Sequence, residues 1–299
     1  MEYNRKKVNI IIFMLILLIS LVTIFAAVDL VEEQEQTNTT DVVAENQEDQ
    51  NSKTEDLPEV KQEEVKLTKA PTFSSGWAAY NYAYKIMKEK DFVLTGTAIG
   101  ENDPISGISL TQYVSEKLYK VGDEYFFVDK ATCGNSLGAN YTKYVYNDGK
   151  NIVSRYEGQN ATTVSVEEFV KKNGQAPDFL YYNLNSKTCT MDSFKISGAS
   201  YVLKITLNAS VPGVFDNMEK ALKNSPKAME FAQGKSATFE IKINRKTGAF
   251  ESFKVSERYY LGVNVPILGL VKSTVTTNTL FTFNWKTTDL TSFKTKLEG

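Results

Sequence analysis

The sequence predicts an α+β fold, in which a long antiparallel β-sheet carries one helix at its start and further helices inserted midway. Two observations predict the sheet: runs of alternating apolar and polar residues recur along the chain, and tight turns such as residues 147–150 separate them. A third observation, an apolar run near the start, predicts one transmembrane helix before the folded part.

Residues 1–28 have the composition of a membrane anchor. Residues 1–7 carry three basic side chains, and residues 8–28 are apolar with three polar interruptions. A span needs about 20 apolar residues, whereas the apolar part of a cleaved signal peptide is usually about 7–15 residues long and ends in a small-x-small site. Phe25 occupies the outer small position here. We therefore favour an uncleaved anchor with a cytoplasmic N-terminus over a signal peptide, which would make the protein secreted; both place the remaining chain outside the cytoplasm.

Residues 29–70 form an acidic stretch, with thirteen Asp or Glu, four Lys and no aromatic residue. Such a composition buries too little apolar surface to offset the entropy of ordering, so it predicts a disordered linker. A plain tether is favoured over an acidic binding arm. Residues 71–299 then form the folded extracytoplasmic β-rich domain, which is mildly basic.

The two cysteines, Cys133 and Cys189, both lie in this domain. Outside the cytoplasm, a single pair most simply predicts one disulfide, closing a loop of about 55 residues. Two free thiols are expected only if the topology is inverted.

Helices are predicted in three places. A helix capped by Ser74 or Ser75 places Trp77, Tyr80, Tyr84 and Met87 on one face. A capping box begins a second helix at Ser165, and Gly174 ends it. A third helical segment is predicted from Val214 to about Gln233.

Strands are predicted between and after these helices. Residues 201–207 alternate in polarity, as do the two arms of the hairpin at residues 240–256, whose turn is residues 245–248. A last strand is predicted at residues 273–287. The sequence has no repeat of fixed period.

These elements resemble the LolA-like superfamily, which includes the LppX and LprG type of envelope lipoprotein. The helix SSGWAAYNYAYKIMKEKD, the hairpin YVYNDGKNIVSRYEG and the pair YVLKITL and FEIKINRKTGAFESFKV around an inserted helix carry the resemblance. It implies a strongly curved half-barrel whose concave side is covered by helices and encloses a cavity for acyl chains. The chain departs from the lipoprotein members because an apolar segment stands where they carry a lipid-attachment Cys.

The residues that most enzymes use are missing. The absence of His removes Ser-His-Asp and Cys-His hydrolysis and His-based zinc sites. Glu167 and Glu168 are explained by helix capping, and the glycines at 134 and 138 lack the Lys and Ser or Thr of a phosphate-binding loop. We therefore predict a protein that is not an enzyme, with no cofactor, no metal site and no nucleic-acid partner.

Residues 260–272 combine seven aliphatic side chains with Gly262, Pro266 and Gly269. A buried strand and turn is favoured over a flexible apolar lip beside a cavity or against the bilayer. If the domain encloses a pocket, the sequence predicts that its lining draws on both helices and on this segment: Trp77, Tyr84, Phe215, Met218, Leu222, Leu261, Ile267 and Leu268.

Two functions fit these patterns. One is a membrane-tethered domain that binds a lipid or another apolar small molecule. The other is a non-catalytic scaffolding module of the cell envelope, which has a filled core and binds a protein partner.

Overall fold

A computed structural model describes residues 60–103, 111–133, 141–175, 179–180, 182–223, 231–265 and 269–298. The predicted anchor at residues 8–28 and the linker up to residue 59 lie outside this range. In the range itself, no helix is both long enough and apolar enough to cross a membrane.

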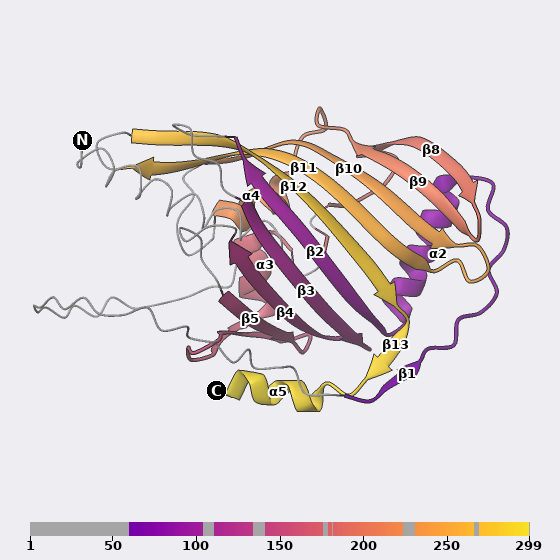
Figure 1. Ribbon diagram of the computed structural model, residues 1–299, viewed down its shortest axis with the longest axis horizontal. Helices are drawn as coiled ribbons and strands as arrows, with labels where there is room; N and C mark the ends of the chain where they lie inside the picture. The colour runs from indigo at the N-terminus through magenta and orange to yellow at the C-terminus, as the bar shows by residue number, and fades with distance from the viewer. Residues whose placement is uncertain are drawn as a thin grey trace, which may run out of the picture.

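The fold is built on one antiparallel sheet of eleven strands (Figure 1). The first six are β2 (Phe92–Asn102), β3 (Thr111–Val121), β4 (Glu124–Cys133), β5 (Tyr141–Asn147), β6 (Asn151–Tyr156) and β7 (Thr162–Ser165). The other five are β8 (Cys189–Ser197), β9 (Ser200–Leu207), β10 (Phe231–Asn244), β11 (Phe250–Val265) and β12 (Gly269–Asn284).

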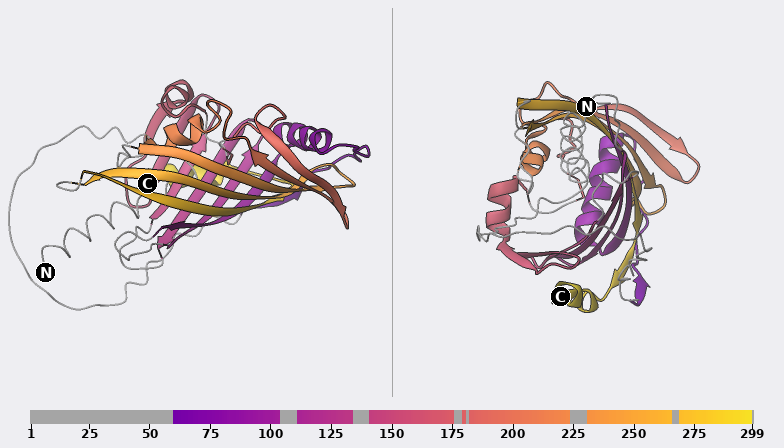
Figure 2. Two further views of the ribbon diagram at one scale, coloured as in Figure 1. Left: turned by 90° about the horizontal axis from the view of Figure 1, so that it is seen from above. Right: turned by 60° about the vertical axis from the view of Figure 1, so that its left-hand side comes forward.

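The strand order is β7-β6-β5-β4-β3-β2-β12-β11-β10-β9-β8. The chain enters at the centre with β2, moves outward to β7, crosses to the far edge at β8 and returns to the centre at β12. The sheet therefore consists of two meanders that meet where β2 pairs with β12. The predicted antiparallel meander is confirmed, and its curvature is plain in Figure 2.

Three helices lie on the concave side of the sheet (Figure 2). Helix α2 (Gly76–Glu89) begins at Ser75, whose side chain accepts a hydrogen bond from the N–H of Ala78, as predicted. Helix α3 (Val166–Asn173) has the predicted capping box and ends at Gly174, which adopts a φ of 88°. Helix α4 (Asp216–Lys223) is shorter than predicted, because residues 231–233 belong to β10 instead.

Three features were not predicted in this form. Strand β1 (Gln62–Glu64) pairs with β13 (Lys286–Thr288), so the folded part begins inside the predicted acidic linker. A C-terminal helix, α5 (Thr291–Glu298), packs on the convex side. Gly262 lies within β11 and does not interrupt it, since that strand runs for 16 residues.

The predicted bridge between Cys133 and Cys189 is not supported, because Cys189 is a free, buried thiol. Cys133 belongs to β4 and Cys189 to β8, and six strands lie between these two in the sheet order. The side chain of Cys133 lies outside the described residues. Burial raises the pKa of the Cys189 thiol, which keeps this thiol protonated and unreactive.

Candidate ligand-binding site on the concave face

The two faces of the sheet are covered by different elements. On β2, Leu94 belongs to the main apolar core on the concave side, whereas Val93 packs in a smaller cluster with Phe293 of α5 on the convex side. Since neighbouring residues of a strand point to opposite faces, the concave face of β2 carries the even-numbered residues 92–102. The same alternation assigns the concave residues of the neighbouring strands through their pairing.

One row of directly paired residues crosses the concave face of ten strands and changes its character midway. Residues that pair directly in an antiparallel sheet lie on the same face. From β8 to β6 the row reads Phe194, Leu203, Ile241, Phe253, Phe281, Gly96, Glu116, Asp129, Lys143 and Tyr156. We call the part on β8–β12 the apolar half and the part on β2–β6 the polar half.

Aromatic side chains fill the apolar half. Phe179, from the segment that links the two meanders, makes T-shaped contacts with Phe253 and Phe281 at centroid distances of 5.7 and 5.4 Å. Tyr80 of α2 packs on Phe250 at 5.7 Å. The segment between α3 and β8 therefore acts as packing for the concave face as well as a connection.

Gly96 marks the boundary between the halves. A Cβ atom at this position would lie 2.8 Å from the Phe281 ring and 3.1 Å from Oε2 of Glu116. Only glycine allows the ring and the carboxyl group to approach each other across β2.

Glu116 and Asp129 are paired across β3 and β4 and are both buried, with exposed fractions of 6% and 2%. Burial raises the pKa of Glu116 well above its usual value, and the nearby Asp129 and Glu257 raise it further. Burial also raises the pKa of Asp129 to about 7, although Lys143 and the hydroxyl of Tyr141 oppose that shift.

Glu257 of β11 is the third buried carboxyl group of this region. Its Oε1 accepts a hydrogen bond from the hydroxyl of Tyr182, which belongs to the linking segment. Burial raises the pKa of Glu257 to about 7, while this hydrogen bond opposes the shift. Glu257 pairs with Thr277 of β12, whose hydroxyl forms a hydrogen bond with the hydroxyl of Tyr259.

Small apolar side chains lie between these polar groups. Ala98, Val114 and Ala131 are directly paired on β2, β3 and β4 and are buried in a cluster separate from the main core. On the concave face, these three side chains lie between Glu116 on one side and Gln112 and Gly100 on the other. The polar half thus combines a small apolar floor with polar groups on two sides.

The predicted lining residues lie near both ends of the long hairpin that β10 and β11 form. Phe215, directly before α4, and Met218 of α4 are buried in the main core, and a Cβ at Gly234 would collide with the Phe215 ring. Helix α2 instead contacts Phe250 of β11. Tyr259, which pairs with Gly234, lies nine residues further along the same strand. Nine residues of strand span about 30 Å, so the contacts of the two helices with the hairpin are widely separated.

The remaining predicted residues differ in burial. Trp77 is half-buried against the core, Tyr84 is 40% exposed with Lys88 over its ring, and Leu261 is buried. The other three predicted positions lie outside the description: Ile267 and Leu268 are not among the described residues, nor is the side chain of Leu222.

Sequence reasoning missed the buried carboxyl groups. In β3, polar residues occupy both faces, since Gln112 and Glu116 point inward while Ser115 and Lys117 point outward. Because both faces of β3 carry polar residues, the sequence pattern does not show which face is buried. The pairing of Glu116 with Asp129 depends on strand register, which the sequence does not display.

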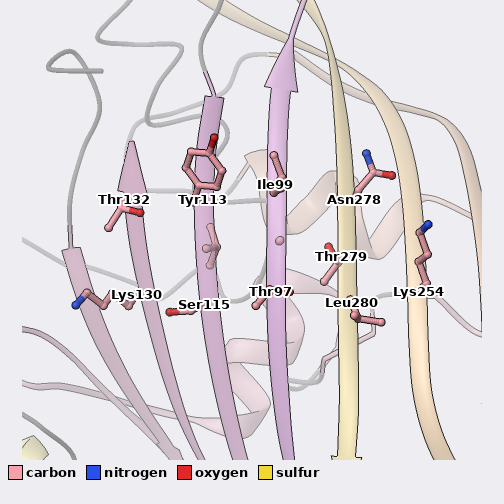
Figure 3. A pocket seen from close by; sticks show the side chains of 12 residues that line it. Thr97, Ile99, Tyr113, Ser115, Lys130, Thr132, Lys254, Asn278, Thr279 and Leu280 are labelled. Carbon is pink, nitrogen blue, oxygen red and sulfur yellow. The ribbon is translucent and has the colours of Figure 1, made fainter. Parts of the chain in front are cut away.

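The convex face carries a depression of about 650 Å³ over β2, β3, β4, β11 and β12 (Figure 3). Its lining includes the exposed side chains of Ile99, Tyr113 and Leu280, with Lys130 and Lys254 at its sides. This surface is open to solvent and lies on the opposite side of the sheet from the buried carboxyl groups.

The described residues contain no group of three His, Cys, Asp or Glu side chains arranged to hold a metal ion.

Comparison with known proteins gives distant similarity only. No protein-family model and no curated protein sequence matches the chain. Among solved structures, a DUF1329 family protein from Desulfovibrio piger is similar at 8% identity and a TM-score of 0.28, over 72% of this chain and 93% of that one.

Two further solved structures are similar to the chain. A putative outer membrane lipoprotein-sorting protein domain from Vibrio parahaemolyticus has 8% identity and a TM-score of 0.31, over 75% of this chain and 98% of that one. A LolA superfamily protein from Nitrosomonas europaea has 8% identity and a TM-score of 0.26, over 73% and 94%. These neighbours agree with the resemblance seen in the sequence. Their TM-scores are below 0.5, so the functional conclusions depend on the residues of this chain.

Proposed function

We propose that the protein is a membrane-tethered, extracytoplasmic domain that binds a lipid or another apolar molecule on the concave face of its half-barrel. One observation carries this proposal: the polar half of that face joins a small apolar floor to buried polar groups that have no hydrogen-bond partner in the described part of the chain. Ligand pockets are mostly apolar and contain a few polar groups that orient the ligand. The apolar run at residues 8–28 provides the tether.

The enclosure of the concave face supports the proposal. Helix α3 follows the edge strand β7, and α4 packs on β10 near the other side of the sheet. The two helices contact each other, and Asn217 of α4 donates a hydrogen bond to Gln175 just after α3. The two helices thus meet on the concave side of the sheet (Figure 2).

The size of the side chains also supports it. Between Leu94 and Asn102, the concave face of β2 carries only Gly96, Ala98 and Gly100, none with a side chain larger than a methyl group. In the apolar half, the row of Gly96 continues with the larger side chains of Phe281, Phe253, Ile241 and Leu203, and Phe179 of the linking segment covers the two rings. A ligand therefore has its best place over β2, β3 and β4.

A matched pair of substitutions tests the proposal. Val114→Trp should block the polar half and abolish binding of a neutral apolar probe such as decanol, with little loss of stability. Ile205→Trp overfills the solid core, so it should lower the free energy of unfolding by about 1–3 kcal/mol and leave binding unchanged.

Native mass spectrometry and thermal unfolding of the full chain, with and without decanol, measure both effects. Absence of any ligand or probe bound to the parent protein would reject the proposal.

A second candidate is a scaffolding module that binds an envelope protein. The depression on the convex face favours this candidate, because it exposes Ile99, Tyr113 and Leu280 side by side on neighbouring strands. Exposed apolar patches of this kind serve interaction sites. Binding of a protein partner that Tyr113→Glu abolishes and Val114→Trp leaves intact would favour the scaffold over the carrier.

A further inference from the structure

The polar half contains four buried oxygen atoms without a hydrogen-bond partner among the described residues. They are Oε1 of Gln112, both carboxyl oxygens of Glu116 and Oδ1 of Asp129. All three side chains are more than nine-tenths buried, and strand alternation directs them to the same concave face. Buried polar atoms are nearly always satisfied, so a cluster of exceptions points to a partner that the chain itself does not supply.

When Glu116 and Asp129 are ionised, all four atoms accept hydrogen bonds, which identifies the chemistry of the missing partner. The amide nitrogen of Gln112 is already used, since it donates to the carbonyl of Thr132 at 2.7 Å. The hydroxyl of Tyr141 donates to Asp129, and that of Tyr182 donates to Glu257. These three donors are thus already used, and a partner for the four acceptors has to bring hydrogen-bond donors of its own.

The charges of the region indicate that this donor is cationic. Two other carboxyl groups, those of Asp129 and Glu257, lie close enough to Glu116 to raise its pKa. In the described part of the polar half, the buried cation paired with them is Lys143, which also lies 5.1 Å from the ring centroid of Tyr156. One ammonium group balances one carboxylate, so ionisation of all three leaves room for further positive charge.

Resting on the proposed function, we propose that the polar half binds the primary ammonium head group of an amphipathic ligand, whose apolar part lies on Ala98, Val114 and Ala131. An ammonium group has three N–H donors and one positive charge, and therefore matches the unsatisfied acceptors of Gln112, Glu116 and Asp129. A metal ion fits less well, because the described acidic side chains do not gather into a metal-binding group.

Four probes with the same ten-carbon chain separate charge from hydrogen bonding. Decylamine supplies both, decyltrimethylammonium supplies charge without N–H donors, decanol supplies one donor without charge, and decanoate is an anion. Each is added to the full chain, and binding is measured by the shift in unfolding temperature and by native mass spectrometry. We expect decylamine to bind at least tenfold more tightly than each of the other three.

Substitution of Glu116 tests whether this preference comes from the polar half. Glu116→Gln should lower decylamine affinity at least tenfold and leave decanol affinity within twofold. Asp129→Asn, which changes another of the proposed acceptors, provides a second variant should Glu116→Gln fail to fold. The matched control is Glu101→Gln, because Glu101 lies on the outward face of β2 and is exposed; it should change neither affinity.

The pattern of binding separates failure of this inference from failure of the proposed function. Equal binding of decylamine and decanol to the parent protein, or an unchanged decylamine affinity in Glu116→Gln, would overturn the ammonium site while leaving an apolar-ligand carrier. No binding of any probe would overturn both.

Discussion

The two halves of the concave face lie on different strands of one sheet and share the same antiparallel pairing, but their side chains are buried in different ways. In the apolar half, Phe253 and Phe281 bury their rings against Phe179, which comes from a distant segment. In the polar half, Glu116 and Asp129 are just as deeply buried, yet oxygens of both lack a partner among the described residues. The first half contributes stability, whereas the second costs stability, and such a cost is typical of a functional site.

The largest expected effect breaks the apolar half. Phe253→Ala removes a ring that contacts Phe179, Phe250 and Phe283 and leaves a cavity in a filled core. The free energy of unfolding should fall by about 3–5 kcal/mol. Urea unfolding of the parent and the variant measures the difference. A loss below about 1 kcal/mol would mean that this half is not the solid core we describe.

A pH titration tests the protonation of two buried carboxyl groups, Asp129 of the polar half and Glu257 of β11. Burial raises the pKa of Asp129 and of Glu257 to about 7 in the folded protein, whereas unfolded Asp and Glu have pKa values of about 3.9 and 4.3. The folded state therefore binds these protons more tightly than the unfolded state. The stability that they contribute is fully present below about pH 4 and is lost as the pH rises through about 7.

We thus expect the free energy of unfolding to fall by several kcal/mol between pH 5 and pH 8, since one unit of pKa corresponds to about 1.4 kcal/mol. The groups that face these carboxyls are Lys143, Tyr141, Tyr182 and Glu116. The double variant Asp129→Asn with Glu257→Gln should flatten the profile. A parent protein whose stability is constant over this interval would show that both groups are already ionised in the fold.

The smallest expected effect is a gain. Glu116→Leu replaces a buried carboxyl group, which has no partner among the described residues, by an apolar side chain. Glu116 lies next to Gly96 in the row of paired residues. The cost of an unsatisfied buried polar group is about 1–3 kcal/mol, so the variant should be more stable than the parent by that amount. Thermal unfolding at pH 7.5 measures the gain. A destabilised variant would mean that Glu116 has a stabilising partner.

Local patterns accounted for much of the fold. The capping box at Ser165, the end of α3 at Gly174 and the turn before Asn151 were all predicted from residues close in sequence, and the structure contains each one. The alternation around Ile241 and Ile243 likewise identified a strand with one buried face. These features depend on short-range hydrogen bonds and backbone preferences, which a single sequence displays.

Other predictions were wrong where contacts between residues far apart in the sequence determine the structure. Residues 231–233 carry no strong helix or strand signal, and they join β10 because Phe231 and Ala232 pair with Gly262 and Leu261 of β11. Cys133 and Cys189 were expected to meet because they are the two cysteines of the chain. The order of the strands places them in different meanders.

The sequence by itself determined the existence and type of most elements, the antiparallel character of the sheet and the lack of His-based chemistry, since these follow from local spacing and composition. Only the tertiary structure decided that β2 meets β12, that Phe179 fills the apolar half and that Glu116 faces Asp129 in the interior. The physical reason is strand register. A shift of one residue would turn Glu116 to the opposite face, and the register is set by packing against residues far away in the chain.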